Sequence, residues 1–316
     1  MSSCVLYKTY SRATMCCLVV GLSLAARPAR IAVAEADAGV LISGNSPQVS
    51  TVGTSSLLAQ PARSWAVDAA ANELKALHHD GSYVRYRMHV RDEKGDQVRD
   101  VFESKDGTVA RLIMRDGRPL SAEEDKAERD RLKAMIDAPN DFQKHIRKEE
   151  TGRKLADSMI RLLPDAMIYT YVPDQPQSGT NHGALEIVMD YQPDPKWKPP
   201  STTAEALTGL KGRIWIDAKS KVLVRMEGTI FQGVNFGWGM LAHIYPGGKL
   251  VLEQTDAGGD RWIYTHFKQE VTVRALMVKN LNVRTNVDAD NFQLLPGPVP
   301  YQEAIRILID TPLPSK

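Results

Sequence analysis

The amino-acid sequence predicts an α+β protein built on a broad, curved antiparallel β-sheet. From Leu210 onwards the chain alternates in steps of two residues, so that Val224 and Met226 point to one side of a strand and Arg225 and Glu227 to the other. Such alternation is typical of antiparallel strands with one buried face and one face in water. A helical pattern precedes the first strands, and a second, charged helical block separates the early strands from the later ones. These patterns predict helices packed against one large sheet.

The first 36 residues have the organisation of an export signal. Lys8 and Arg12 precede an apolar run at 13–26, and small residues end the segment at Ala36. We therefore expect cleavage after Ala36, with a cut near Ala26 as the alternative. The apolar run is shorter than the roughly 20 residues of a membrane-spanning helix, which disfavours an uncleaved anchor. The sequence thus predicts export to the periplasm, with an association with the outer membrane as an option and no transmembrane segment in the mature chain.

Composition excludes several classes of function. The cysteines Cys4, Cys16 and Cys17 all lie within the signal, so the mature chain has no thiol for catalysis, for disulfides or for zinc. The signal contains four of the 40 Lys and Arg residues but only one of the 38 Asp and Glu residues, which leaves the mature chain a net charge of −1. The basic stripe that neutralises phosphates is missing, and this argues against nucleic-acid binding.

A flexible segment is expected at 37–63, which is rich in Ser, Gly, Thr and Ala and has no sustained period. The remainder, 64–316, is expected to fold as one domain, because no change of pattern divides it into two cores. It opens with a helix that Ser64 caps. The predicted buried face of this helix consists of apolar residues at helical spacing, namely Val67, Ala70, Leu74 and Leu77.

Three strands and a helical insertion follow this helix. Turn signals at Lys94-Gly95 and Asp106-Gly107 separate the strands, which are predicted at 82–90, 97–103 and 108–115. The insertion at 121–163 begins with a capping box between Ser121 and Glu124. We expect three helices in it, with Gly152 and Pro164 as breaks: 121–136, 141–149 and 153–163.

The remaining strands are predicted wherever alternation resumes between turn signals. Their expected ranges are 167–172, 184–191, 212–217, 222–231, 250–254, 262–273 and 276–285. Between the fourth and fifth of these, the segment at 231–241 combines three aromatic residues with three glycines. Glycine in a strand marks a bend, a bulge or the close approach of another group. The segment is therefore either a tight corner whose aromatic residues fill the core or a hydrophobic mouth at the rim of the sheet.

The segment at 212–226 resembles a family of periplasmic carriers. It reads Gly-Arg-Ile-Trp-Ile-Asp and then, from Lys221, Lys-Val-Leu-Val-Arg-Met, which is similar to a strand–turn–strand of the outer-membrane lipoprotein-sorting (LolA/LolB-like) superfamily. Asp288, Asp290 and the Asn-Phe-Gln-Leu at 291–294 are similar to the closing element of that family. The resemblance implies an open half-barrel whose helices cover the concave face. It also implies that lipid or lipoprotein acyl chains bind between sheet and helices, which is reasonable for loosely covered apolar surface.

Residue patterns for catalysis or metal binding are weak. His78 and His79 diverge by about 100° on a helix, so they do not share a metal ion easily. Asp288 and Asp290 begin like a calcium loop, yet no glutamate closes it, and a turn before the last strand is the preferred interpretation. The chain contains no P-loop and no Gly-x-Ser-x-Gly elbow. We therefore expect no cofactor, no metal ion and no enzymatic activity.

The sequence thus predicts a non-enzymatic periplasmic protein that binds a lipid or the acyl chains of a lipoprotein. The predicted cavity-lining residues of the sheet are Met226, Ile230, Phe236, Trp238, Ile263 and Phe267. Leu155 and Met159 are expected to face them from the helical insertion. Two alternatives remain open: a scaffold or sensor that binds an envelope protein through the same fold, and an exported hydrolase.

Overall fold

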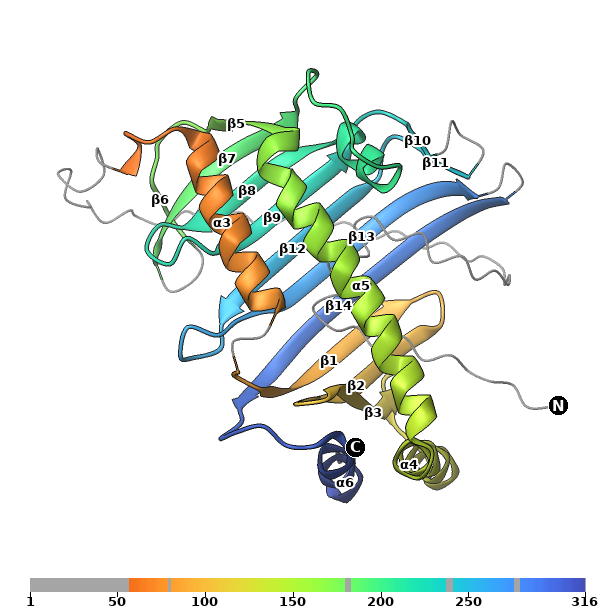
Figure 1. Ribbon diagram of the computed structural model, residues 1–316. Helices are drawn as coiled ribbons and strands as arrows, with labels where there is room; N and C mark the ends of the chain where they lie inside the picture. Colours follow the sequence, from red (N-terminus) through yellow and green to blue (C-terminus); the bar gives the residue numbers. More distant parts are fainter. Residues whose placement is uncertain (1–56, 79–80, 180–182, 237–240, 276–278, 316) are drawn as a thin grey trace.

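The computed structural model describes residues 57–315, except 79–80, 180–182, 237–240 and 276–278. The expected signal peptide at 1–36 and most of the expected flexible segment at 37–63 lie outside the described residues. Within the described part, the strands form a 14-stranded curved sheet that does not close into a barrel, and helices cover its concave face (Figure 1). The expectation of an α+β half-barrel is therefore confirmed.

The strand order is β4-β3-β2-β1-β14-β13-β12-β9-β8-β7-β5, and neighbouring strands run antiparallel. The first and last long strands, β1 and β14, pair with each other, so the two ends of the domain meet in the middle of the sheet. The shorter strands β6, β10 and β11 lie off this path. The strand bounds are β1 Val84–Asp92, β2 Gly95–Ser104, β3 Gly107–Arg115, β4 Arg118–Pro119, β5 Met167–Tyr171, β6 Gln177–Ser178, β7 Leu185–Pro193, β8 Leu210–Asp217, β9 Leu223–Ile230, β10 Val234–Phe236, β11 Ala242–Ile244, β12 Lys249–Asp256, β13 Trp262–Ala275 and β14 Lys279–Leu294.

A row of directly opposed apolar side chains crosses the concave face and forms its core. Residues opposite each other in neighbouring strands lie on the same face of a sheet, so the register identifies this row. Its members, from β7 to β1, are Met189, Ile214, Met226, Leu252, Phe267, Val287 and Val90. All seven side chains are buried. On the opposite face, Arg225 forms ion pairs with Glu227 and Glu253, as the alternation predicts.

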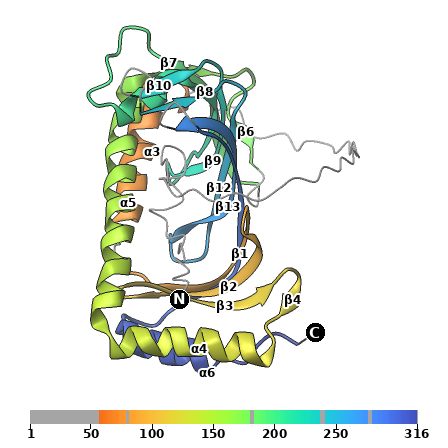
Figure 2. The ribbon, with the colours of Figure 1, turned by 90° about the vertical axis from the view of Figure 1, so that its right-hand side faces the viewer.

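Helix α5 (Pro139–Ala166) runs across the concave face from one edge of the sheet to the other (Figure 2). Its 28 residues span about 42 Å at 1.5 Å per residue. The nine steps from β3 to β5 cover about 43 Å of sheet at roughly 4.8 Å per strand. Helix α4 (Ala122–Asp137) precedes it beside β3. A straight helix over a curved sheet leaves space between the two, and the cavities described below lie under the middle and the C-terminal part of α5.

The expected break of the insertion into three helices at Gly152 and Pro164 is wrong. Only one break occurs, at Ala138 between α4 and α5, and the helix runs through both predicted breakers. A glycine inside a helix costs only about 1 kcal/mol, which the burial of Phe142, Met159 and Ile160 outweighs. Pro164 lies in the last turn, where the helix continues for only two further residues. The capping box between Ser121 and Glu124 is confirmed.

The N-terminal helix α3 (Ala62–Leu77) begins two residues before the predicted Ser64, with Pro61 at its N-cap. Its predicted buried face is only partly correct. The buried residues are Trp65, Ala66, Ala69, Glu73 and Leu77, whereas Val67 is 40% exposed. The predicted Ala70 and Leu74 are half-buried against α5. Tertiary packing overrode the apolar pattern because the sheet supplies partners for a buried glutamate, described below.

Two further elements differ from the sequence-based expectation. The segment 288–291 is part of β14 rather than a turn, and Asn291 has a positive φ near the register shift opposite Arg85 and Arg87. The pairing of β14 with β1 holds this segment in the sheet. A C-terminal helix, α6 (Tyr301–Asp310), was not predicted and packs against β2, β3 and α4. The short 3-10 helix η1 (Thr203–Gly209) ends the polar connection before β8.

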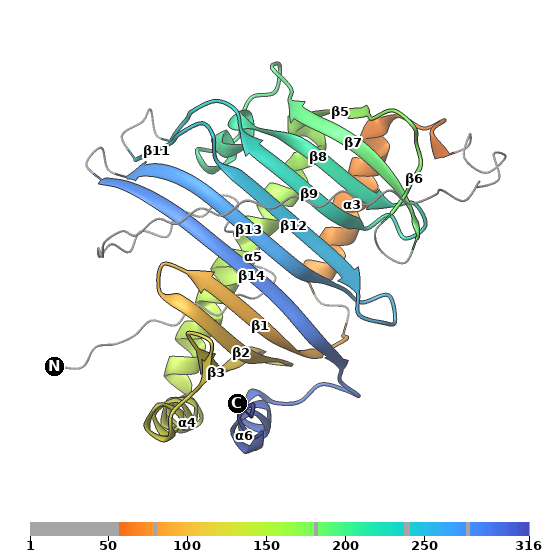
Figure 3. The ribbon, with the colours of Figure 1, turned by 180° about the vertical axis from the view of Figure 1, so that it is seen from behind.

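The glycine-rich segment at 231–241 forms β10 and then leads to β11, which joins the sheet through β13. Phe236 is buried in the core, and Phe231 is 40% exposed beside Lys211. Residues 237–240, including Trp238, lie outside the described residues. Seen from behind, the strands from β14 to β7 carry no described helix on the face opposite the concave one (Figure 3), whereas α4 and α6 pack against the outer face of β2 and β3, where Phe102 and Val109 meet Leu132 and Ile305.

Candidate functional site: an apolar cavity under two helices

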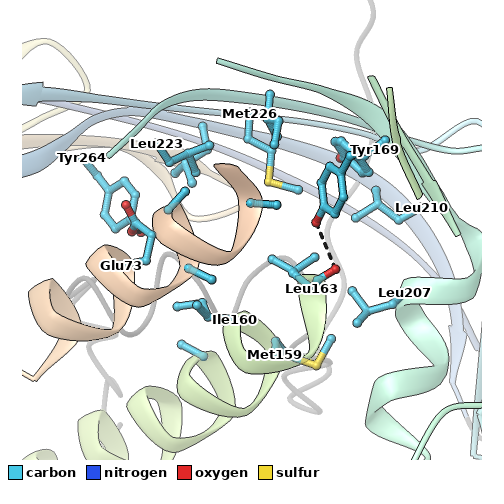
Figure 4. A pocket seen from close by; sticks show the side chains of 17 residues that line it. Glu73, Met159, Ile160, Leu163, Tyr169, Leu207, Leu210, Leu223, Met226 and Tyr264 are labelled. Carbon is cyan, nitrogen blue, oxygen red and sulfur yellow. Dashed lines mark hydrogen bonds between the residues drawn. The ribbon is translucent and has the colours of Figure 1, made fainter. Parts of the chain in front are cut away.

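A cavity of about 100 Å³ lies between the concave face of the sheet and helices α3 and α5 (Figure 4). Its walls are overwhelmingly apolar. The helices contribute Ala66, Ala69, Ala70, Glu73, Ala156, Met159, Ile160 and Leu163. The sheet and η1 contribute Tyr169, Tyr191, Leu207, Leu210, Ile214, Leu223, Met226, Leu252 and Tyr264. Small side chains on the facing helices keep this space open, because alanine leaves unfilled the volume that a larger residue would occupy.

Glu73 is the charged residue in this wall, and its carboxylate is hydrogen-bonded within the protein. Its carboxylate accepts a hydrogen bond of 2.6 Å from Gln254 Nε2 and one of 2.8 Å from the Tyr264 hydroxyl. Gln254 also donates to the Leu223 carbonyl oxygen. A buried carboxylate is tolerated when hydrogen bonds replace its hydration. Glu73 therefore fastens α3 to β12 and β13, and this bond explains why a charged residue takes a buried position on the helix.

The tyrosines of the wall also direct their hydroxyls to the backbone. Tyr191 donates to the Glu227 carbonyl oxygen at 3.0 Å, and Tyr169 donates to the Leu163 carbonyl oxygen at 2.9 Å. Burial raises the pKa of both hydroxyls, so both remain neutral donors. Their rings are left as apolar wall. The polar atoms of Glu73, Tyr169 and Tyr191 are thus bonded within the protein, and the cavity behaves as a hydrocarbon-like environment.

A pair of opposed glycines allows this wall to form. Gly212 in β8 faces Gly228 in β9. A Cβ atom on Gly228 would lie 2.9 Å from the Tyr191 hydroxyl, and one on Gly212 would lie 1.9 Å from the Glu227 carbonyl oxygen. Both glycines are needed for the close approach of Tyr191 to β9. The predicted strand–turn–strand at 212–226 is confirmed as a pairing, and its Asp217 accepts hydrogen bonds from Ser220 within the turn.

Met226 and Met159 are the predicted site residues that line the cavity. Ile230, Phe236 and Phe267 are buried in the same core but outside the cavity wall, and Leu155 is half-buried against it. Ile230, Phe236 and Phe267 lie on parts of the concave face that α3 and α5 leave outside the cavity. Trp238 lies outside the described residues.

Ile263 is buried in the same core but does not line the cavity, whereas its neighbour Tyr264 does. The register between β12 and β13 shifts between Glu253 and Gln254, so Gln254 opposes Tyr264 while Thr255 opposes Ile263. A bulge adds a residue to one strand and reverses the alternation beyond it. Tyr264 therefore takes the position in the cavity wall that the uninterrupted pattern predicted for Ile263.

The residues that sequence reasoning missed are mainly the alanines of α3 and the polar anchors. Trp65, Ala69, Glu73 and Leu77 recur every four residues, so a helical stripe was visible in the sequence. The charged Glu73 interrupts the apolar character that a buried helical stripe normally has. Its partners on β12 and β13 are about 180 and 190 residues away in the chain, and no local pattern reveals them.

Helix α3 also has polar contacts at its edges, besides its buried face. Asn72 donates to the carbonyl oxygens of Ser220 and Lys221, at 3.0 Å each. Lys221 pairs with Asp68 at 2.5 Å. At its C-terminal end His78 contacts Asp157 of α5 at 2.6 Å. Surface pairs of this kind contribute little individually, about 0–1 kcal/mol. The buried side chain of Trp65 and the hydrogen bonds of Glu73 hold the helix more firmly.

Among the described residues no cluster of three His, Cys, Asp or Glu side chains has the arrangement of a metal site. In the same part of the chain no helix is both long enough and apolar enough to cross a membrane. No family model, no curated protein and no solved structure matches the sequence or the fold.

Proposed function

We propose that this protein is a non-enzymatic carrier or receptor of the cell envelope that binds a hydrocarbon chain in the apolar cavity. One observation carries the proposal: the wall is apolar, and the polar atoms of Glu73, Tyr169 and Tyr191 are already bonded within the protein. Such a cavity offers a ligand the removal of apolar surface from water, at about 25 cal/mol per Å². It offers no free group for acid–base or nucleophilic chemistry. The signal-like segment at 1–36 supports a location in the periplasm.

The size of the cavity indicates how a chain would enter. At about 100 Å³ it is smaller than the roughly 150 Å³ of an apolar cavity that holds benzene. A lipid acyl chain therefore requires α3 and α5 to move away from the sheet. This movement breaks the edge contacts of α3 at Asp68, Asn72 and His78 and also the hydrogen bonds of Glu73 to Gln254 and Tyr264. The hydrocarbon then replaces the apolar contacts between helices and sheet.

Native mass spectrometry of residues 37–316 isolated from the periplasm, with organic extraction, would test the proposal. The same protein would then be titrated with hexadecanol, a neutral probe. Ala69→Phe should fill the cavity and weaken hexadecanol binding by about tenfold or more, which corresponds to ~1.4 kcal/mol. Ala71→Phe, on the exposed side of the same helix, is the matched control and should bind like the parent chain.

Circular dichroism would show that both variants are folded, and Ala69→Leu provides a smaller change if Ala69→Phe is not. The proposal fails if the folded parent protein carries no extractable lipid and takes up no hexadecanol. It also fails if Ala69→Phe and Ala71→Phe bind the probe equally well. A stable co-purifying protein, without lipid, would favour the alternative of a protein-binding scaffold on this fold.

A further inference from the structure

A second, polar cavity of about 440 Å³ continues the apolar one along α5. Residues 146–153 of α5 line the polar cavity, and residues 156–163 of the same helix line the apolar one. Glu149, Arg153, Ala156 and Ile160 are spaced four, three and four residues apart, so they share one face of the helix. Leu77 lines the polar cavity and also packs with Ala156 and Ile160. The partition between the two cavities is therefore about one side chain thick.

The floor of the polar cavity is the turn between β2 and β3. Glu103, at the end of β2, already pairs with Arg261 at 2.9 Å and accepts a hydrogen bond from the backbone N–H of Val84. Gly107 of the turn approaches α5 so closely that a Cβ atom would lie 2.2 Å from Ile146 Cδ1. The walls of this cavity are thus held in place by close packing and by a buried ion pair.

Arg153 interacts electrostatically with Glu149 and Glu150 of its own helix but forms no close ion pair with either. Six i,i+3 or i,i+4 ion pairs of Lys or Arg with Asp or Glu form on α4 and α5, among them Lys154–Glu150 at 2.9 Å and Arg161–Asp157 at 2.6 Å. Glu149 stands four residues before Arg153, which is the favourable order for such a pair. Yet among the described residues the Arg153 side chain forms no hydrogen bond and no ion pair within 4 Å. It is half-buried in the cavity wall.

Glu149 is committed elsewhere and is poorly suited to neutralise Arg153. Its Oε2 accepts a hydrogen bond of 3.3 Å from the Thr108 backbone N–H, and its Oε1 is buried without a hydrogen-bond partner, 3.6 Å from His145 Nε2. Burial raises the pKa of Glu149 to about 7, so a large share of this carboxyl is uncharged at neutral pH. Lys105, on the turn, adds a second cation without an ion pair among the described residues.

The wall of the polar cavity also contains the carboxylates of Glu103, Asp106 and Glu150. Glu103 pairs with Arg261, Glu150 pairs with Lys154, and Asp106 accepts a hydrogen bond from the Tyr301 backbone N–H. An anion from outside would therefore meet Arg153 and Lys105.

We propose that the polar cavity is the headgroup subsite for the ligand of the apolar cavity, and that Arg153 selects an anionic headgroup, a carboxylate or a phosphate. This inference rests on the proposed function of the apolar cavity. A guanidinium binds carboxylate and phosphate oxygens through charge-assisted, often paired hydrogen bonds. From Arg153 to Leu163, ten residues of α5 span about 15 Å. An amphiphile lying along this face would place its chain over Ala156, Ile160 and Leu163, with Leu77 displaced.

Binding of hexadecyl phosphate, palmitate and hexadecanol to residues 37–316 tests the inference. The parent protein should bind the two anionic amphiphiles at least about tenfold more tightly than hexadecanol, and this preference should decline with salt. Arg153→Gln should remove the preference and leave hexadecanol binding unchanged. Arg147→Gln, an exposed arginine on the same helix, is the matched control and should preserve the preference. Inorganic phosphate alone should bind weakly, because it gains nothing from the apolar cavity.

The outcomes separate the two proposals. Binding of none of the three amphiphiles contradicts the proposed function itself. Equal binding of charged and neutral amphiphiles, or a preference that survives Arg153→Gln, overturns the headgroup subsite while chain binding stands. Tight binding of inorganic phosphate that depends on Arg153, without uptake of hexadecyl phosphate, would also overturn it, because the site would then serve a free anion.

Discussion

Replacing Arg111 by leucine tests how the C-terminal helix is held to the sheet. The Arg111 side chain on β3 is only 1% exposed. Its Nη1 donates to the carbonyl oxygens of Leu308 and Thr311, at 2.5 Å each, and its Nη2 donates to Asp125 of α4 at 2.7 Å. One buried guanidinium therefore joins β3, α4 and the C-terminal end of α6, where a cation also suits the helix dipole.

The expected loss of unfolding free energy follows from these contacts. A hydrogen bond to a charged group contributes about 1.5–3 kcal/mol, and removing one partner of a buried pair costs about 3–5 kcal/mol. Asp125 keeps its pair with Arg129 at 2.7 Å, so it is not left unpaired. The carbonyl groups at the end of α6 do lose their donor. We expect Arg111→Leu to lower the free energy of unfolding by about 3–5 kcal/mol.

Urea unfolding of residues 37–316 measures this loss, and hydrogen exchange of amides 301–310 locates it. Arg115→Leu on the same strand is the matched control. Arg115 is 39% exposed and lies 3.6 Å from Glu124, a surface pair worth about 0–1 kcal/mol. Equal losses in the two variants, or unchanged exchange in α6 despite the substitution at Arg111, would refute the assignment of Arg111 as the clamp of this helix.

Two further predictions concern Glu149 in the polar cavity and the glycine pair of β8 and β9 behind the apolar one. The pKa of Glu149 is raised from 4.5 to about 7, so Glu149 binds a proton more tightly in the folded protein than in the unfolded chain. The protonated carboxyl therefore contributes free energy of unfolding that is fully present below pH 4.5 and is lost as the pH rises through about 7. At ~1.4 kcal/mol per pKa unit, the free energy of unfolding measured in urea should fall by about 3 kcal/mol over this pH range in the parent protein and should not fall in Glu149→Gln. The same dependence of the unfolding free energy on pH in parent and variant would contradict this. Gly212→Ala should destabilise by about 3 kcal/mol or more, because its Cβ atom would lie 1.9 Å from the Glu227 carbonyl oxygen. Gly297→Ala is the control: nothing lies within 4 Å of the added Cβ atom, so the free energy of unfolding should hardly change. Similar urea midpoints for the two alanine variants would contradict the close packing of β8 against β9.

Strand periodicity in the sequence determined the type of sheet. The alternation around Val224 and Met226 predicted one buried and one solvated face; both side chains are buried, and Met226 lies in the concave core. A period of two places a side chain on a face by its position alone, without knowledge of its partner. Tyr264 lines the cavity in place of Ile263, because a bulge that depends on pairing with β12 shifts the alternation there.

Helix ends were predicted well where the signal is local and poorly where packing decides. The capping box at Ser121 holds because its atoms lie within three residues of each other. Gly152 did not break α5, since its cost is small beside the burial gained along a helix that spans the sheet. The amphipathic pattern of α6 was present in the sequence, with apolar residues at Tyr301, Ile305 and Leu308, and was overlooked.

The sequence by itself determined that this chain builds an α+β protein with a curved antiparallel sheet, because alternation and capping are properties of neighbouring residues. Only the tertiary structure decided where the cavities lie. The apolar cavity arises from a straight helix crossing a curved sheet, and its boundary depends on Glu73 meeting Tyr264 across 191 residues of chain. Arg153 became distinct from the other arginines of its helix only because folding left it facing a polar cavity without an ion pair. Contacts between distant segments set such features, and local spacing carries no information about them.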